Sequence, residues 1–290
     1  MKLDFFCRVH TVNPADPNQD EQGTKNDAPQ LPPSIVVLDT ETVENLALDF
    51  EFGCYAFCEL VDGGGYISCE EGILFRDDLQ PKFARVIREY AECPPARLGE
   101  LAQTRIRVRT RTDFVKNVLW PTLRAGGAVV GLNLGFDLSR ISIHYSAMRD
   151  GKSFKFLTTD YLDKKTGKRK PSSVVPAITR TSIDSKKSYY SVHFSFACKA
   201  DGRPILSDEE IAEFRKSRFL DVRTVAASLT NESHSLESLC RTFTAPPDIA
   251  KLKYVPGPIT PEKIRYCRQD VKSHFVGAEY AHSRVSPSPR

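Results

Sequence analysis

Two carboxylates stand at the end of a short apolar run near the start of the chain. The run Ile35-Val36-Val37-Leu38 leads directly into Asp39-Thr40-Glu41. A continuous apolar run predicts a strand buried on both faces, near the middle of a sheet, and residues two apart on it point to the same side. Buried like charges repel each other unless a cation lies between them. Asp39 and Glu41 are therefore candidate ligands of a hard divalent cation, and a strand end with two solvated acids is the alternative.

Two later segments place an acid in a similar context. Asp137 ends the stretch Asn133-Leu134-Gly135-Phe136-Asp137, which follows the short apolar run 128–132. Asp270 lies four residues after Tyr266 in a predicted helix, so the two side chains share a helix face. Asp221, which also follows an apolar pair, is the best additional acid, and we interpret it as structural or supporting. Each of these acids is placed where an apolar element meets a predicted crevice.

The elements that must position these residues include both strands and helices. Residues 52–61 and 66–69 predict an antiparallel hairpin around Asp62-Gly63-Gly64-Gly65. The helix after the 128–132 strand has a predicted apolar stripe of Leu138, Ile141, Tyr145 and Met148. Further helices are predicted at residues 81–90, 112–124, 224–229, 235–243 and 261–282, and a further strand at 219–222. This order predicts an α/β protein with a mixed β-sheet flanked by helices.

Composition restricts the class of protein. The 290 residues suit one large domain, or one domain that carries an insertion. No apolar run approaches the roughly 20 residues of a membrane span, and the N-terminus lacks the apolar region of a signal peptide. The eight cysteines form no CxxC pair, so neither a zinc cluster nor a disulfide framework is predicted. We interpret Cys54, Cys58 and Cys69 as core positions of the hairpin and expect an intracellular, cytoplasmic protein with free thiols.

Positive charge is concentrated in one region. Between Asp150 and Lys187 there are ten Lys or Arg against four Asp or Glu, a local charge of +6 in a chain whose net charge is +4. This region belongs to a predicted β-rich insertion at about residues 150–215. Gly167 marks a loop tip there, surrounded by Lys164, Lys165, Lys168, Arg169 and Lys170. A basic loop of this kind contacts nucleic-acid phosphates or is simply solvated. The alternating Arg105, Arg107, Arg109 and Arg111 predict a cationic strand face or a surface edge strand.

Together, the acidic segments resemble the three motifs of the DEDD 3′–5′ exonucleases, the DnaQ-like branch of the ribonuclease H-like fold. The first motif is Asp39-Thr40-Glu41. The second is Asn133-Leu134-Gly135-Phe136-Asp137, in the form seen in ribonuclease D and in proofreading domains of family A polymerases. The third is Tyr266-Cys267-Arg268-Gln269-Asp270, in the form that defines the DEDDy subgroup. The resemblance covers residues 35–145 and 218–282 and leaves the insertion unexplained.

The resemblance implies a domain organisation and a metal site. The exonuclease domain would span residues 35–285, between a flexible leader (1–34) and a short tail (286–290). Two divalent ions, Mg²⁺ or Mn²⁺, about 4 Å apart, would be held by Asp39, Glu41, Asp137 and Asp270. Asp39 would bridge both ions, Glu41 and Asp270 would complete the site beside the attacking water, and Asp137 would support the second ion. Tyr266 would orient the attacking water.

The implied reaction is hydrolysis of phosphodiester bonds at 3′ ends, with single-stranded DNA as the expected substrate. An RNA exonuclease similar to ribonuclease D is the alternative, because discrimination depends on contacts to the 2′-hydroxyl. A catalytically inert nucleic-acid-binding domain of the same fold is the third hypothesis. Candidate substrate contacts are Thr40, Asn133, Phe136, Lys168, Arg169 and Lys170, and Asn133 also suits a role in holding its turn. A polymerase or another replication or repair protein is an expected partner. The histidines His144, His193 and His274 are interpreted as packing or surface residues.

Overall fold

The computed structural model describes most of the expected domain. It covers residues 31–62, 64–92, 106–172, 176–183, 188–193, 206–215, 218–242 and 251–285. Most of the predicted leader, up to residue 30, and the predicted tail (286–290) lie outside the described residues. Within the described part, no helix is both long enough and apolar enough to cross a membrane.

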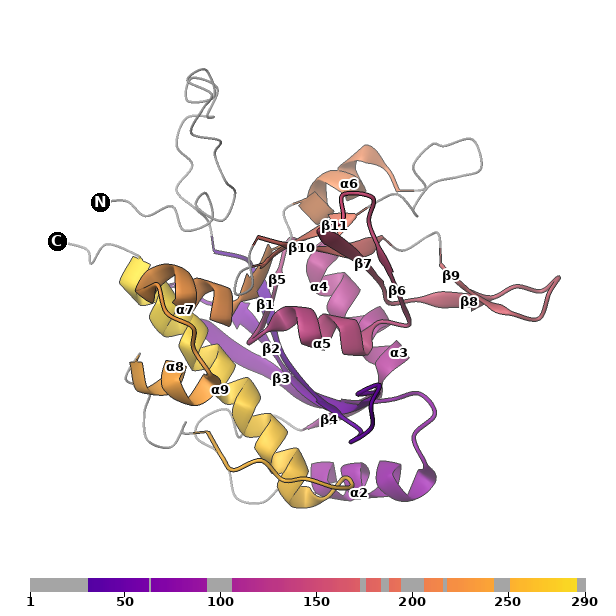
Figure 1. Ribbon diagram of the computed structural model, residues 1–290, viewed down its shortest axis with the longest axis horizontal. Helices are drawn as coiled ribbons and strands as arrows, with labels where there is room; N and C mark the ends of the chain where they lie inside the picture. Colours follow the sequence, from indigo (N-terminus) through magenta and orange to yellow (C-terminus); the bar gives the residue numbers. More distant parts are fainter. Residues whose placement is uncertain are drawn as a thin grey trace.

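A six-stranded mixed sheet forms the centre of the molecule (Figure 1). Its strands lie in the order β12 (Arg218–Asp221), β5 (Ala128–Gly131), β1 (Ser34–Thr42), β2 (Phe50–Leu60), β3 (Tyr66–Phe75) and β4 (Arg107–Thr110). β1 runs antiparallel to β2 and parallel to β5, and β12 is parallel to β5. The predicted α/β class with a mixed sheet is confirmed, and the predicted central position of β1 is confirmed with it.

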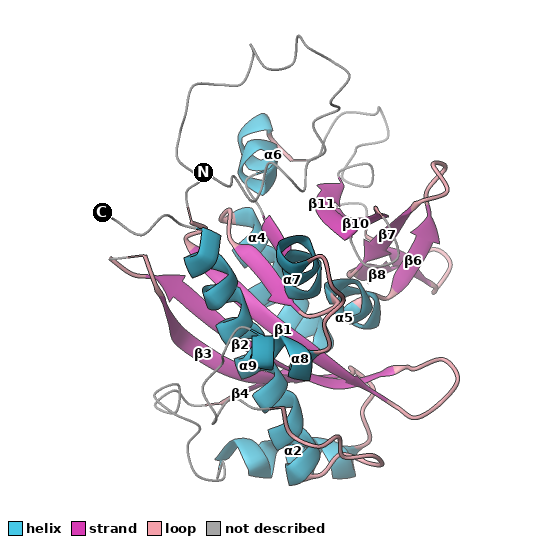
Figure 2. Ribbon diagram, turned by 60° about the vertical axis from the view of Figure 1, so that its left-hand side comes forward, coloured by secondary structure: helices cyan, strands magenta, loops and turns pink. Residues whose placement is uncertain are grey.

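Helices cover both faces of this sheet (Figures 1 and 2). Because side chains alternate along β1, Ile35 and Val37 pack on one face and Val36 and Leu38 on the other. The first face carries α2 (Pro81–Glu92), α7 (Val222–Thr230), α8 (Leu236–Thr242) and α9 (Pro261–Val285). The second carries α3 (Arg111–Phe114), a π-helical turn (Val115–Leu119), α4 (Trp120–Arg124) and α5 (Leu134–Ile141). Asp39 and Glu41 continue the alternation of Ile35 and Val37, so they point toward the face that α9 covers.

A second, smaller sheet packs beside α5. Its antiparallel strands lie in the order β11 (Ser188–His193), β10 (Ala177–Ser182), β7 (Ser153–Leu157) and β6 (His144–Ala147). A two-stranded hairpin of β8 (Asp160–Leu162) and β9 (Arg169–Pro171) projects away from the body of the molecule (Figure 1). α6 (Asp208–Arg215) follows this region and contacts α4. These strands occupy the region of the predicted β-rich insertion, and they begin earlier than residue 150.

The predicted helix after β5 is too long. α5 ends at Ile141, and Tyr145 lies in β6, where 65% of its surface is exposed. Tyr145 pairs with Phe156 of β7, and Met148 lies beyond the strand. The apolar spacing from Leu138 onward fits a helix, but pairing of β6 with β7 supplies the backbone hydrogen bonds instead.

The arginines around β4 do not form a free cationic face. Arg109 is held by Glu70, and Arg111 is buried, with hydrogen bonds to the carbonyl oxygens of Ile141 and Thr158. Arg111 also begins α3 rather than continuing the strand, and Arg105 lies outside the described residues.

The hairpin cysteines differ in burial. Cys69 is exposed, so its predicted core position is wrong, whereas Cys54 and Cys58 are buried as predicted.

Candidate metal and catalytic site

Asp39 and Glu41, near the end of β1, lie at the edge of the apolar core beneath α9. Glu41 is buried, and the Asp39 side chain keeps 16% of its surface exposed. Asp39, Glu41 and Cys267 of α9 each offer one ligand atom, and these three atoms lie within 4.8 Å of one another. Asp39 and Glu41 therefore lie close together, and solvent reaches the site on the side of Asp39.

Asp137 reaches the same region from α5. The turn before α5 contains Asn133 in the left-handed conformation, with φ 60° and ψ 45°, which Asn tolerates better than most residues. The Asn133 amide donates to Asp221 Oδ1 at 3.1 Å. Asp137 Oδ1 then accepts two hydrogen bonds from Thr40, one from the backbone amide at 3.0 Å and one from the hydroxyl at 2.7 Å. Thr40, predicted as a substrate contact, is placed here with its hydroxyl on Asp137.

α9 supplies Tyr266 and Asp270. The Thr260 hydroxyl accepts a hydrogen bond from the Lys263 amide at 3.2 Å, so the predicted N-cap before Pro261 is present. Tyr266 is 6% exposed and Asp270 is 4% exposed. The Tyr266 hydroxyl lies close enough to Asp270 for this carboxylate to raise the pKa of the phenol. This burial and this contact exclude the alternative that Tyr266 is an ordinary surface tyrosine.

Burial raises the pKa of all four acids. Burial raises the pKa of Asp39 well above its ordinary value, and the charges of three neighbours add to the rise, in the order Asp137, Asp270 and Glu41. Burial likewise raises the pKa of Glu41 to about 7 and that of Asp137 to about 8. The pKa of Asp270 rises to about 6, again because of burial. The fold has therefore gathered four carboxylates whose pKa values stay raised although nearby lysines offset part of the effect at Glu41 and Asp270.

Two lysines border the cluster, and the sequence pattern did not single out either. Lys263 is fully buried, donates to Glu51 Oε2 at 2.9 Å and to the Gly257 carbonyl at 2.8 Å, and lowers the pKa of Glu41 against the larger effect of burial. The Lys251 ammonium lies 3.9 Å from Asp270 Oδ2 and 5.8 Å from the centroid of the Tyr266 ring. Lys251 lies in an irregular segment, where no periodic pattern marks it, so only the tertiary structure identifies it.

His274 was interpreted as a packing or surface residue, and it proves to be a buried neighbour of Asp39. Its Nε2 atom lies 3.9 Å from Asp39 Oδ1, and its Nδ1 atom lies 3.3 Å from the Leu38 carbonyl oxygen. A carbonyl oxygen only accepts, so Nδ1 carries the proton in this contact. Burial lowers the pKa of His274 to about 4, so the ring is neutral at physiological pH and adds no positive charge beside Asp39. Its position four residues after Asp270 on α9 was the only sequence signal.

Asp221 holds the turn before α5 rather than the cluster itself. Its Oδ1 accepts hydrogen bonds from the amides of Asn133, Arg223 and Thr224, and its Oδ2 accepts one from the Tyr190 hydroxyl at 3.3 Å. It therefore caps α7 and links β11 of the second sheet to the segment that carries Asp137. This agrees with its interpretation as a supporting acid.

The donor set fits hard divalent cations. Carboxylate oxygens are the preferred ligands of Mg²⁺ and Mn²⁺, and four carboxylates gather here with pKa values raised mainly by burial. Asp270 Oδ1 is buried and has no hydrogen-bond partner among the described residues. An oxygen in that state costs free energy unless something binds it. A cation between these oxygens would remove both penalties.

The other candidate substrate contacts lie outside this cluster. Asn133 is exposed, and Phe136 is partly exposed, with the Arg140 guanidinium 5.0 Å from its ring centroid. Lys168, Arg169 and Lys170 are exposed on the β8–β9 hairpin. The structure therefore unites the four acids with Tyr266 and leaves the hairpin cations on a separate projecting element.

No protein-family model matches the sequence, and no curated protein matches it.

Proposed function

We propose that this chain is a metal-dependent 3′–5′ exonuclease of the DEDDy type, with a ribonuclease H-like fold. The observation that carries the proposal is that Asp39 is buried within electrostatic reach of Glu41, Asp137 and Asp270, and that burial raises the pKa of all four acids. Buried like charges destabilise a fold when nothing compensates them. A binding domain without catalysis has no need of such a cluster, whereas a metal-dependent phosphodiesterase uses one to hold its ions.

Divalent ions bound here, Mg²⁺ or Mn²⁺, would activate the attacking water and stabilise the leaving 3′ oxygen and the charge on the phosphate. The chain's own residues prepare this chemistry. Thr40 fixes one oxygen of Asp137 through two hydrogen bonds, which orients the carboxylate before any ligand binds. His274 and Cys267 contact Asp39 from α9 and restrict its movement.

Tyr266 is suited to orienting water and not to removing its proton. Burial, together with the charge of Asp270, raises the pKa of Tyr266 above its ordinary value near 10. The phenol therefore stays protonated at neutral pH. Its oxygen can still accept a hydrogen bond and its proton can be donated, so it can fix the direction of a neighbouring water molecule.

The substrate proposed is a single-stranded DNA 3′ end, and a polymerase or another replication or repair protein is the proposed partner. Time courses on 3′-labelled and 5′-labelled DNA and RNA, with Mg²⁺, Mn²⁺ or EDTA, test the proposal. We expect release of nucleotides from the 3′ end that requires metal and is lost in Asp39→Asn. The exposed Glu237→Gln on α8 is the matched control and should retain full activity.

Each other outcome selects a different function. Preferential degradation of RNA would indicate an exonuclease similar to ribonuclease D. Binding of DNA or RNA without hydrolysis under any metal condition would indicate an inert domain of the same fold. Release of the 5′ label first would contradict the proposed polarity.

A further inference from the structure

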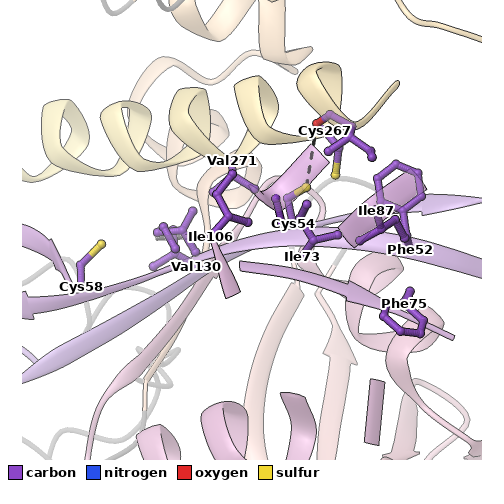
Figure 3. Close-up of a cluster of buried hydrophobic side chains, with 14 of the residues drawn as sticks. Phe52, Cys54, Cys58, Ile73, Phe75, Ile87, Ile106, Val130, Cys267 and Val271 are labelled. Atoms are coloured by element: carbon purple, nitrogen blue, oxygen red, sulfur yellow. Dashed lines mark hydrogen bonds between the residues drawn. The ribbon is translucent and has the colours of Figure 1, made fainter. Parts of the chain in front are cut away.

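One residue of the candidate site is chemically unlike the others. Cys267 lies on α9, and Figure 3 shows it above Cys54 of β2, with Val271 one turn further along the same helix. Cys267 is completely buried in the apolar cluster that includes Cys54 and Val271. An aliphatic residue would fill this volume equally well. The thiol, however, also contacts Asp39, with Sγ 3.4 Å from Oδ2 and 3.7 Å from the backbone carbonyl oxygen.

Cys267, Asp39 and Glu41 form a mixed sulfur and oxygen donor set. Their ligand atoms lie within 4.8 Å of one another. With Zn–S near 2.3 Å and Zn–O near 2.1 Å, two ligands at tetrahedral positions around zinc are about 3.6 Å apart. The distance of 3.4 Å between Cys267 Sγ and Asp39 Oδ2 is close to that value. The thiol proton now occupies the position between sulfur and oxygen that a cation would take.

A second observation indicates a ligand in the same space. Asp270 is 4% exposed, and its Oδ1 has no hydrogen-bond partner among the described residues. Asp270 is also close enough to Asp39 and Glu41 that its charge raises the pKa of both. A buried oxygen without a hydrogen-bond partner therefore belongs to an acid that acts electrostatically on both proposed oxygen ligands.

We propose that Cys267 gives this site a thiolate ligand, so that it binds Zn²⁺ or Cd²⁺ through Cys267, Asp39 and Glu41 in competition with Mg²⁺ or Mn²⁺. Hard cations prefer the oxygen ligands, whereas thiolate sulfur favours zinc-class cations. Binding replaces the thiol proton, which passes to the buffer, so one proton is released for each ion held by Cys267. Because Asp39 and Glu41 belong to both ligand sets, the two classes of ion exclude each other. This inference rests on the proposed metal site, and it adds the class of ion that would inhibit it.

Cadmium is the probe, because a thiolate bound to Cd²⁺ gives an ultraviolet charge-transfer absorption. The full-length protein is titrated with Cd²⁺ without nucleic acid, and the parallel titration with Zn²⁺ is followed by calorimetry. We expect Cys267→Ser to lose one thiolate contribution to the Cd²⁺ absorption and to bind Zn²⁺ roughly tenfold more weakly or worse, a loss of about 1.4 kcal/mol. Its Mn²⁺ affinity should change much less. Cys54→Ser is the matched control, because Cys54 is equally buried beside Cys267 and contributes no ligand.

Equal Cd²⁺ absorption in Cys267→Ser and in the unaltered protein would overturn the inference. If Cys267→Ser does not fold, the unaltered protein and Asp39→Asn still test it. Excess Mn²⁺ and the Asp39→Asn substitution should each reduce the absorption, and persistence of the full absorption in both cases would refute a shared site. Failure of the proposed function is distinguishable, because it would appear as absence of Mn²⁺ binding and of hydrolysis, whatever the thiol does.

Discussion

The carboxylate site and the β8–β9 hairpin both concentrate charge, but the fold treats that charge in opposite ways. On the hairpin, Asp163 lies beside Lys170, and the hydrogen bond from Lys170 lowers the pKa of Asp163. In the site, burial and neighbouring acids raise the pKa of Asp39. The hairpin is exposed, and two of its cations are paired with its own acids, Arg169 with Asp160 and Lys170 with Asp163. The site is buried, and Lys251 and Lys263 offset the charge of its four acids only in part, so a bound cation should stabilise the folded protein.

The strongest test of this contrast removes one carboxylate from the site. Asp39→Ala should abolish hydrolysis, by roughly a thousandfold or more, because several kcal/mol of transition-state stabilisation depend on the cations that Asp39 holds. In EDTA the variant should be at least as thermally stable as the unaltered protein, because removal of a like charge relieves repulsion. Nuclease assays and thermal denaturation measure the two effects. A large loss of stability in EDTA would mean that Asp39 is a structural acid.

The second test separates orientation of water from binding of metal. Tyr266→Phe should lower kcat roughly a hundredfold and leave the affinity for Mn²⁺ nearly unchanged, because the phenol contacts Asp270 and is not itself a proposed ligand. Tyr254→Phe is the matched control, since its ring packs against Tyr266 at 5.6 Å while the residue is 45% exposed. Full activity of Tyr266→Phe from pH 7 to about pH 9 would remove Tyr266 from the mechanism.

The third test uses pH. The folded-state pKa values of Asp270, Glu41 and Asp137 are raised to about 6, 7 and 8. Acids with raised pKa values favour the folded state while they are protonated, and that contribution is lost as pH rises through these values. The metal-free protein should therefore lose thermal stability between about pH 6 and about pH 8, by several degrees.

Divalent ions should reverse this trend. They bind the deprotonated carboxylates, so the rise in Tm on addition of Mn²⁺ should be larger at pH 8 than at pH 6. The exposed-acid variant Glu237→Gln should show the same profile as the unaltered protein. A metal-free Tm that increases with pH across this range would contradict the assignment of a buried cluster whose pKa values are raised in the folded protein.

The smallest effect is expected at the hairpin. Arg169 is paired with Asp160 and Lys170 with Asp163, whereas no ion pair joins Lys164, Lys165 or Lys168 to an acid within the described part of the chain. Changing the three tip lysines to Gln should weaken binding of long single strands. It should also flatten the salt dependence by about two units of slope, since each phosphate contact on a single strand contributes about 0.7.

Cleavage of a dinucleotide should change little in that variant, because so short a substrate does not extend to the hairpin. The Lys82→Gln, Lys116→Gln double variant removes exposed cations from other elements and should leave the salt slope unchanged. An unchanged slope in the tip variant would show that the hairpin is a solvated loop, and the contrast between the two charged regions would then have no functional counterpart.

Local patterns were enough to predict most elements and the main acids. The apolar run before Asp39 requires burial on both faces, and the structure places β1 between β2 and β5. The Thr260-Pro261 pair marks the start of α9, and the spacing of Tyr266 and Asp270 places them on one helix face. Such signals are readable because hydrophobic periodicity and capping act within a few residues.

Contacts between residues distant in the sequence could not be predicted from those patterns. The apolar residue Tyr145 extends the helical stripe of α5, yet it lies in β6, because pairing with β7 overrides local preference. Arg111 continues the alternating arginines, yet it turns inward to the carbonyl oxygens of Ile141 and Thr158. Only the tertiary structure brings these partners, distant in the sequence, within hydrogen-bonding distance.

The candidate site shows the same division. The sequence by itself determined which four carboxylates and which tyrosine are candidates for the site, because motif spacing and hydrophobic periodicity single them out. The tertiary structure alone decided their surroundings: Thr40 on Asp137, Lys251 beside Asp270, and Cys267 against Asp39. Those contacts join residues as many as 228 positions apart. No local spacing encodes them, because they exist only once α5 and α9 have packed against the central sheet.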